Sequence, residues 1–500
     1  MIYILTTIII IVSMFVMAQR TKFALHMIQI KNYETDTYKM WLKENKDIAL
    51  SLYKRQIPVY QELDFTKRAT RLYRLNLFVN IIILALFSIP ALVTGKVSLI
   101  ILLLLGVALI YLLDSYIMIL SNSIILPIEN NINTGFYLKA QEKIENMKDL
   151  RTVGITGSFG KTSTKFIANA ILEQNYNVLN PPESYNTPMG LSKTINDELE
   201  EGTEVFLAEM GAKRIGDIRE IAKLCKPHIG IITSVGPTNM DTFRNIDNVM
   251  KTKYELIEEL PAEGIAIFNY DDRDIRKLAD KTFKEKLLYG LEDTENLDIY
   301  ADDIVISEYG SAFTLRDKEG NSERCTTKLL GKHNISNILA GVCASRVLGL
   351  SFEEIGVGIE NIKPIPHRLT VKKSNSGIIM IDDTFNSDPA GTKAALEVLN
   401  QFKEGKKIIV TPGMIELGDL EEDANIELGE NIGKICDYAI LVGSKRTDAI
   451  YKGLMEENFN EDNIFIVDDI EDIYPRIQRL AKPKDIVLFE NDLPDIFTNY

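Results

Sequence analysis

The chain has 500 residues, enough for two or three domains. Its formal net charge of -15 argues against a general nucleic-acid binder, because such proteins carry an excess of positive charge. Four dispersed cysteines and four histidines give no zinc site, so any catalytic metal should be a hard cation bound by oxygen, as Mg²⁺ is.

Three long apolar runs occupy the first part of the chain, at about residues 2–18, 75–94 and 97–120. Each is long enough to cross a bilayer, and the short gap between the second and third predicts a helical hairpin. A cleaved signal peptide is the alternative for the first run, but no basic residue precedes it. Asp114 lies in the third run, and its plain interpretation is a position near the interface or against a neighbouring helix.

The loop between the first two runs, residues 20–74, is rich in lysine and arginine. The positive-inside rule places this loop in the cytoplasm, the N-terminus outside and everything after about residue 122 in the cytoplasm. Contact with anionic lipid is the plain explanation for the basic residues themselves. We therefore predict a multi-pass cell-membrane protein in which residues 1–129 form the membrane region and the catalytic part is cytoplasmic.

A glycine-rich loop at residues 154–162 follows a short apolar strand and leads into a helical run from Ser163 to about Glu173. A strand, a glycine turn and a helix N-terminus make a phosphate cradle, because backbone N–H groups and the helix dipole attract an anion. Lys161 adds a mobile positive charge. The usual nucleotide loop requires glycine where Ile155 stands, so the match is imperfect, and an ordinary glycine turn is the alternative.

Strands and helices alternate after this loop, which predicts a parallel sheet covered on both faces. Glu209 lies at the end of an apolar strand, where a carboxylate is well placed for Mg²⁺ on a nucleotide; a solvent-facing charge is the alternative. Residues 296–330 predict a small β extension. Pro364 and Pro366 flank a stiff segment that we interpret as a domain boundary. A Rossmann-like domain follows, with strands expected at 377–381, 407–411, 438–442, 464–467 and 485–489.

Nine motifs in order resemble those of the Mur ligases, ATP-dependent amide-bond ligases of cell-wall precursor synthesis. The motifs are Thr156-Gly-Ser-Phe-Gly-Lys-Thr162, Asn186-Thr-Pro-Met-Gly190, Glu209-Met-Gly-Ala212, Gly236-Pro-Thr-Asn-Met-Asp241, Lys251-Thr-Lys-Tyr-Glu255, Asn269-Tyr-Asp-Asp272, Gly331-Lys-His-Asn334, His367-Arg-Leu369 and Asp382-Asp-Thr-Phe-Asn-Ser-Asp-Pro389. Within the family the chain is similar to the MurF type, which adds D-alanyl-D-alanine to a UDP-N-acetylmuramoyl-tripeptide. The resemblance implies an α/β fold in which transmembrane helices precede a central ATP-binding domain at 130–365 and a C-terminal Rossmann-like domain at 366–500.

The resemblance also implies a mechanism with ATP and Mg²⁺. A substrate carboxylate attacks the γ-phosphate of ATP, and an amine then attacks the acyl phosphate to give the amide. Catalytic roles fall on Lys161, Lys253 and Arg368, of which Lys253 corresponds to the family lysine that is carbamylated and becomes a metal ligand. The implied metal ligands are Thr162, Glu209, Lys253 and Asn239. The implied nucleotide contacts are Gly157, Ser158, Gly160, Lys161, Thr162, Ser163, Asn334, Arg368 and Asp383.

The chain departs from the family in four places. The soluble domain that holds the UDP of the precursor has no counterpart, and the membrane region stands in its place. Asn239 and Asn425 stand at or near positions where histidine is usual. The last strand continues as Leu488-Phe-Glu-Asn-Asp-Leu-Pro-Asp495, whereas a Lys-Gly-Ser turn is usual.

The expected partners are ATP, a UDP- or lipid-linked cell-wall precursor and an amino acid or dipeptide, with no nucleic acid. Three alternatives stay open. The chain could serve another polymer, such as poly-γ-glutamate or a pseudomurein-like peptide; it could amidate a lipid-linked muropeptide; or it could be a membrane scaffold that binds ATP without turnover.

Overall fold

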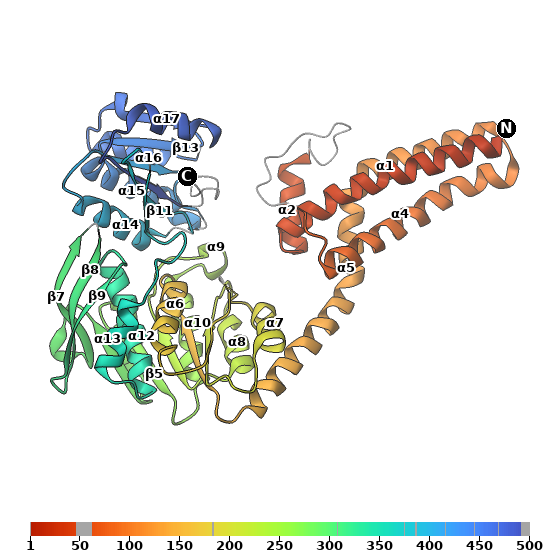
Figure 1. The fold of residues 1–500 in the computed structure, drawn as a ribbon. Coiled ribbons are helices and arrows are strands. Elements are labelled where there is room, and N and C mark those ends of the chain that lie inside the picture. Colours follow the sequence, from red (N-terminus) through yellow and green to blue (C-terminus); the bar gives the residue numbers. More distant parts are fainter. Residues whose placement is uncertain are drawn as a thin grey trace. The chain divides into compact units, whose positions relative to one another are not determined.

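A computed structural model describes residues 2–46, 63–182, 185–307, 309–374, 376–385, 388–415, 417–444, 446–468 and 470–491 (Figure 1). Part of the predicted basic loop and the residues after 491 lie outside these ranges. The described chain is α/β after an all-helical beginning, as predicted.

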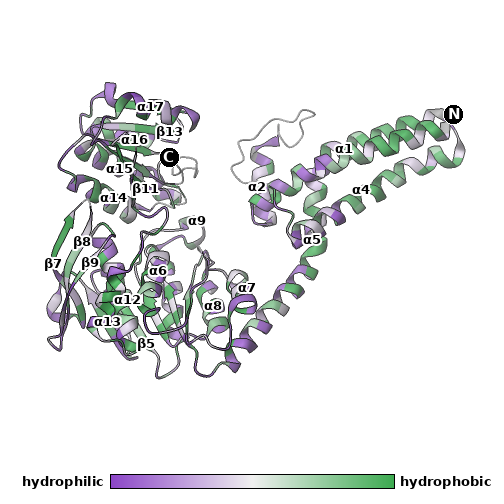
Figure 2. Cartoon of the chain, in the orientation of Figure 1, coloured by the Kyte–Doolittle hydropathy of each residue, from purple (hydrophilic) through white to green (hydrophobic). Residues whose placement is uncertain are grey.

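Three long helices form the first part of the chain: α1 (Ile2–Ile30), α4 (Lys67–Thr94) and α5 (Ile100–Asn146). Among the described residues, these are the helices long and apolar enough to cross a membrane, and Figure 2 shows apolar residues running along them. The short helix α2 (Thr35–Glu44) follows α1, and the turn η1 (Val97–Leu99) precedes α5. The helices extend past the predicted runs, because the backbone hydrogen bonds of a helix continue through polar residues.

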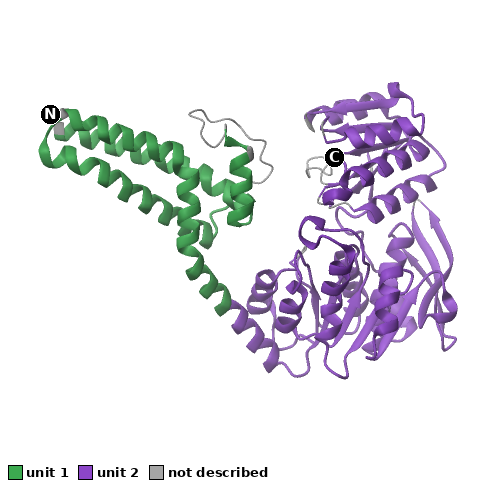
Figure 3. Cartoon of the chain, turned by 180° about the vertical axis from the view of Figure 1, so that it is seen from behind, with its two compact units in different colours: residues 1–135 green, residues 136–500 purple. Residues whose placement is uncertain are grey.

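The chain divides into two compact units, Met1–Gly135 and Phe136–Tyr500 (Figure 3). In the first unit Asp114 of α5 is buried, and its Oδ1 accepts hydrogen bonds from Asn80 (2.6 Å) and Asn76 (2.9 Å) of α4 and from Thr21 of α1 (3.3 Å). The acid therefore packs against neighbouring helices, which agrees with one of its two plain interpretations.

A nine-stranded sheet organises the first part of the second unit, in the order β2-β3-β1-β4-β5-β6-β7-β8-β9. Its first seven strands in sequence run parallel, and β8 and β9 continue it antiparallel. The strands are β1 (Arg151–Thr156), β2 (Val178–Leu179), β3 (Val205–Glu209), β4 (Ile229–Ile232), β5 (Ile265–Asn269), β6 (Lys286–Gly290), β7 (Ile299–Ser307), β8 (Gly310–Asp317) and β9 (Ser322–Thr327). The β extension expected at 296–330 is confirmed as β7 to β9.

Helices cover both faces of this sheet, as predicted. They are α6 (Lys161–Leu172), α7 (Pro188–Glu198), α8 (Asp217–Cys225), α9 (Met240–Phe243), α10 (Ile246–Glu258), α11 (Arg273–Lys281), α12 (Lys332–Val347) and α13 (Phe352–Glu360). Residues alternate between two separate buried clusters: Leu207 of β3 belongs to one, and its neighbours Phe206 and Ala208 belong to the other. After β1 the chain builds β2 and β3 on one side and then crosses to β4, so a switch point lies at the carboxyl ends of β1 and β4.

A six-stranded sheet organises the remainder of this unit, in the order β10-β11-β15-β12-β13-β14. Its strands are β10 (Thr370–Lys373), β11 (Ile379–Asp383), β12 (Lys407–Thr411), β13 (Tyr438–Val442), β14 (Ile464–Val467) and β15 (Ile486–Glu490), with helices α14 (Pro389–Gln401), α15 (Glu421–Ile435), α16 (Asp448–Glu456) and α17 (Ile473–Leu480). Five strands lie where the sequence predicts them, within two residues. The antiparallel edge strand β10 was not predicted.

Candidate active site

The glycine-rich loop joins the end of β1 to the start of α6, as predicted. Gly160 has a positive φ of 79° and caps α6, a conformation that glycine adopts without strain. A Cβ on Gly157 would lie 2.0 Å from the Thr233 Oγ1, so only glycine fits there. The loop backbone therefore packs directly against the Thr233 side chain. The N-terminus of α6, which follows the loop, is open to an anion.

The segment after β4 holds this loop in place. The hydroxyl of Thr233 donates to the Phe159 carbonyl (2.6 Å), and the Phe159 N–H donates to the Ser234 Oγ (2.8 Å). The Ser158 Oγ lies 2.9 Å from both the N–H and the carbonyl of Gly236. Ser158 therefore fixes the loop through its side chain.

Glu209 lies at the end of β3 beside the loop and is 1% exposed. Its Oε1 accepts hydrogen bonds from the Thr162 hydroxyl and the Asn186 amide, both at 3.0 Å. Its Oε2 makes no hydrogen bond to a described residue and lies 3.7 Å from the Lys165 Nζ. A buried carboxylate oxygen without a hydrogen bond, next to a hydroxyl, is the donor chemistry that Mg²⁺ prefers.

Two lysines lie in the same region with perturbed basicity. Burial, together with the charge of nearby Lys161, holds the pKa of Lys253 well below that of an ordinary lysine. A lower pKa makes the neutral amine more accessible, and the neutral amine is the form that can react with carbon dioxide. Burial also lowers the pKa of Lys161, whose Nζ donates to the Gly157 carbonyl (2.7 Å) and the Ser158 carbonyl (3.0 Å).

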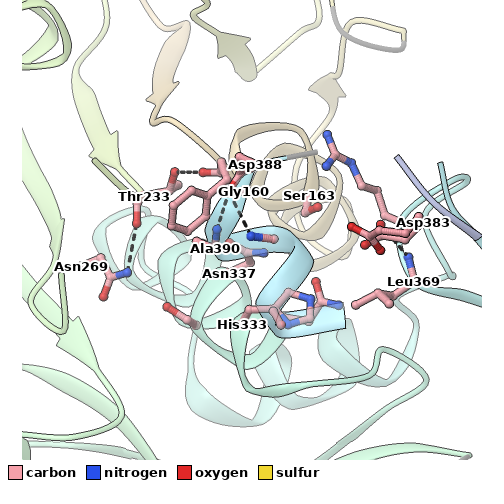
Figure 4. A pocket seen from close by; sticks show the side chains of 17 residues that line it. Gly160, Ser163, Thr233, Asn269, His333, Asn337, Leu369, Asp383, Asp388 and Ala390 are labelled. Carbon is pink, nitrogen blue, oxygen red and sulfur yellow. Dashed lines mark hydrogen bonds between the residues drawn. The ribbon is translucent and has the colours of Figure 1, made fainter. Parts of the chain in front are cut away.

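A pocket of about 200 Å³ opens beside the loop and takes residues from both sheets of the second unit (Figure 4). Gly160 and Ser163 line it from the loop and α6, and Arg368 and Asp383 line it from the C-terminal sheet and its connection. The Arg368 guanidinium stacks on the Phe385 ring at 4.6 Å, and its Nε makes no hydrogen bond to a described residue. A half-buried guanidinium whose Nε donor is open suits a phosphate.

The backbone around Arg368 is in an uncommon conformation. Its two neighbours, His367 and Leu369, have positive φ values of 58° and 45°. Such conformations in residues other than glycine persist where the surrounding structure imposes them. The Leu369 N–H donates to the Asp383 Oδ1 (3.2 Å), which ties this segment to the end of β11.

The start of α12 forms another wall of the pocket. Asn334 is buried, and its amide donates to the Leu330 carbonyl (2.8 Å), which fixes the orientation of its side chain. Burial, aided by the charge of Arg368, lowers the pKa of His333 to about 4, so this imidazole is neutral at physiological pH. Neutral polar groups of this kind suit a nucleobase edge.

Comparison with known proteins identifies the family. The Mur ligase middle domain matches residues 155–345, and the Mur ligase, glutamate ligase domain matches residues 367–490. The chain belongs to the Mur ligase family. The predicted α/β fold and the predicted ATP-dependent ligase are thereby confirmed.

Two curated Mur ligases illustrate the similarity. The UDP-N-acetylmuramoyl-tripeptide–D-alanyl-D-alanine ligase of Bacillus subtilis is 30% identical over 341 residues, which are 68% of this chain and 72% of the relative. The enzyme of the same name from Escherichia coli is 30% identical over 56% of this chain and 61% of the relative.

Solved Mur ligase structures have the same fold. The MurF ligase from Thermotoga maritima in complex with ADP has a TM-score of 0.65 and 27% identity. The matched region covers 72% of this chain and 80% of the Thermotoga maritima chain. MurF from Acinetobacter baumannii has a TM-score of 0.65 at 24% identity, over 73% of this chain and 79% of its own.

The structure of this Mur ligase brings most of the predicted site residues together. Gly160, Ser163, Asn334, Arg368 and Asp383 line one pocket, and Lys161, Thr162, Glu209 and Lys253 lie at the loop beside it. Asn239 does not line this pocket: it caps α9 with a positive φ of 48°, and its amide donates to the Thr238 hydroxyl.

Asn425, which stands near an expected histidine, is buried and bonded to backbone. Its amide oxygen accepts from the Met414 N–H (2.9 Å), and its amide nitrogen donates to the carbonyls of Met414 (3.0 Å) and Glu421 (2.9 Å). Asn425 therefore holds the loop after β12 in place.

Several residues in the pocket or beside it were not predicted. Lys165 is completely buried and pairs with Glu209, and Asp388 and Glu490 bring two further carboxyl groups to the pocket. Asp388 lies in a quoted motif, which is a signal that could have found it. Lys165 follows Lys161 by one helical turn, but nothing in its own sequence context distinguishes it from a solvated lysine.

Proposed function

We propose that this chain is a membrane-anchored Mur ligase that joins D-alanyl-D-alanine, or a similar amino acid or dipeptide, to a cell-wall peptidoglycan precursor. The carrying observation is the Thr162–Glu209 hydrogen bond beside a phosphate loop whose pocket also contains Arg368. The curated relatives add D-alanyl-D-alanine to a UDP-linked tripeptide, which supports this choice of substrates.

Each residue of the site has a proposed chemical role. Lys161 and the α6 N-terminus bind the transferring phosphate, and Arg368 neutralises the charge that develops on it. Asn334 contacts adenine and Asp383 contacts ribose. Thr162, Glu209 and carbamylated Lys253 would hold Mg²⁺, which supplies further neutralisation of phosphate charge when bound. Asn239 is a remaining candidate ligand, because an amide oxygen can bind Mg²⁺.

The two parts of the site come from different domains, which we place at 130–365 and 366–500. The connection between α13 and β10 carries Arg368 and contains Pro364 and Pro366. We infer that movement about this connection closes the site on ATP and the acceptor, which excludes water from the activated carboxylate.

The membrane region anchors the enzyme with its catalytic part in the cytoplasm. The three long helices satisfy the length and composition of membrane spans, and the basic loop between the first two favours a cytoplasmic location. An acceptor carried on a lipid would then be reached without a domain that binds UDP.

ADP release tests the proposal. The full-length protein in detergent is given ATP, Mg²⁺ and D-alanyl-D-alanine with either a UDP-linked or a lipid-linked tripeptide precursor. We expect acceptor-dependent ADP release and amide formation, and Lys161→Ala should reduce both at least about a hundredfold. Absence of ADP release with every acceptor, or full complementation of a deletion by Lys161→Ala, would instead support a scaffold.

A further inference from the structure

Two carboxyl groups meet at the wall of the nucleotide pocket. Asp383 ends β11 and Glu490 ends β15, and the register of these parallel strands pairs the two residues. Side chains in register on neighbouring strands point to the same face of a sheet. Both residues line the pocket that contains Arg368, and Asp383 is labelled in Figure 4.

Glu490 has an unsatisfied oxygen in this pocket. The side chain is 1% exposed and hydrogen-bonds to Thr392, but its Oε2 has no hydrogen-bond partner among the described residues. A buried carboxylate oxygen without a donor is costly, so a ligand that brings a donor to this point would bind favourably.

The surroundings of Glu490 select the class of donor. In the part of the chain that the structure describes, no group of three His, Cys, Asp or Glu side chains is arranged to hold a metal ion. Arg368 already supplies positive charge to Asp383, Asp388 and Glu490. These carboxyl groups therefore already have a cation beside them, and the open Oε2 of Glu490 can accept a hydrogen bond from a neutral donor such as a hydroxyl. The two neighbouring hydroxyls of a ribose are neutral donors, and two carboxyl groups on paired strand positions offer an acceptor to each.

We propose that Glu490 acts with Asp383 to bind the ribose hydroxyls of the nucleotide, which makes Glu490 a specificity-determining residue for ribonucleotides. This inference rests on the proposed function, which puts an adenine nucleotide in this pocket. Burial and the neighbouring Asp383 carboxylate both raise the pKa of Glu490. A raised pKa favours the protonated form of one of the two carboxyl groups, and a paired acid and carboxylate can both accept from and donate to hydroxyl groups.

Binding of three nucleotides tests the inference on the full-length protein in detergent. Dissociation constants are measured calorimetrically for ADP, 2′-deoxy-ADP and 3′-deoxy-ADP. The wild type should bind ADP about tenfold to a hundredfold more tightly than at least one deoxy analogue. Glu490→Gln, which keeps the side-chain volume, should reduce that preference at least about fivefold and leave the dissociation constant of that analogue unchanged.

Two further variants complete the design. Glu490→Ala removes both acceptor oxygens and should reduce the preference at least as much as Glu490→Gln. Glu404→Gln is the matched control, because Glu404 is an exposed residue of the same sheet domain and pairs with Lys484 on the surface. It should leave all three dissociation constants unchanged.

Each remaining outcome overturns a specific claim. If both Glu490 variants fold and bind all three nucleotides as the wild type does, Glu490 does not contact the sugar. If they weaken the binding of all three nucleotides equally, Glu490 acts on the pocket as a whole. The inference then fails while the proposed function stands. If the wild type binds no ADP, the proposed function fails and this inference fails with it.

Discussion

Replacement of Asp383 by Asn should stabilise the protein above neutral pH while it weakens nucleotide binding. Burial raises the pKa of Asp383 to about 7 against the opposing charge of Arg368, so the folded protein favours the protonated carboxyl. An acid whose pKa rises on folding costs stability above that pKa, and the cost disappears below the unfolded value of 3.8. Asn is neutral throughout and keeps an oxygen for the Leu369 N–H.

The size of the effect follows from the two pKa values. The difference between 3.8 and about 7 corresponds to about 4 kcal/mol, at about 1.4 kcal/mol for each pH unit. The advantage of the variant should therefore be close to zero at pH 4, grow between pH 4 and pH 7, and then stay constant. In a unit of this size a change of that order corresponds to a Tm difference of a few °C, which should be largest above pH 7.

Calorimetric unfolding of the full-length protein between pH 4 and pH 8.5 measures this difference. Asp423→Asn, at an exposed position of α15, is the control and should follow the wild type at every pH. ADP should bind Asp383→Asn about tenfold more weakly than it binds the wild type, because a charge-assisted hydrogen bond to the sugar is lost. A Tm difference that does not change with pH, or that favours the wild type at pH 8, would refute the argument.

Three other predictions test separate parts of the molecule. Lys253→Ala should lower acceptor-dependent ADP release at least about a hundredfold, whereas Lys251→Ala, at an exposed position of the same helix, should stay within twofold of the wild type in the same assay. Asp114→Ala should destabilise the helical unit by about 1–3 kcal/mol. Asp114→Asn should destabilise it by less, because Asn keeps an acceptor for the α4 amides. Thermal unfolding in detergent, followed by the circular dichroism of the helices, measures the stability of both variants. Asn425→Ala should cost about 1–3 kcal/mol in calorimetric unfolding, because the N–H and carbonyl of Met414 lose their partners, and an unchanged Tm would contradict this role.

The strands of the two sheets could be predicted because buried parallel strands are short, continuous apolar runs. The strands β12, β13 and β14 begin and end where the sequence places them. Three strands escaped prediction for physical reasons. The edge strand β10 reads Thr370-Val-Lys-Lys373 and pairs with a single neighbour, so it needs no apolar run. The strand β6 reads Lys286-Leu-Leu-Tyr-Gly290 and β2 consists of Val178 and Leu179 alone, so neither contains an apolar run long enough to predict a strand.

The residues of the candidate site also fall into two groups, those that could be predicted from the sequence and those that could not. Lys161, Thr162 and Glu209 could be predicted because a local motif or a strand end positions each of them. Lys165 and Glu490 could not, since their roles depend on burial against segments that are distant in sequence. The departure at Glu490 was visible as a residue difference, but only the register of β11 and β15 shows that this residue lies beside Asp383 at the pocket that contains Arg368.

The fold also makes a testable distinction between two forms of the acceptor, a lipid-linked precursor and a UDP-linked one. The family matches begin at residue 155, and the preceding chain contains long apolar helices. A lipid-linked acceptor and an anchored enzyme share one surface, which raises their effective concentration without any additional binding domain. We therefore expect the protein in vesicles to have a kcat/KM at least about tenfold higher for a lipid-linked tripeptide precursor than for the UDP-linked one. In detergent micelles that dilute the lipid the advantage should shrink, because the shared surface is lost. An equal kcat/KM for both acceptors in vesicles would show that the long apolar helices do not replace recognition of the carrier.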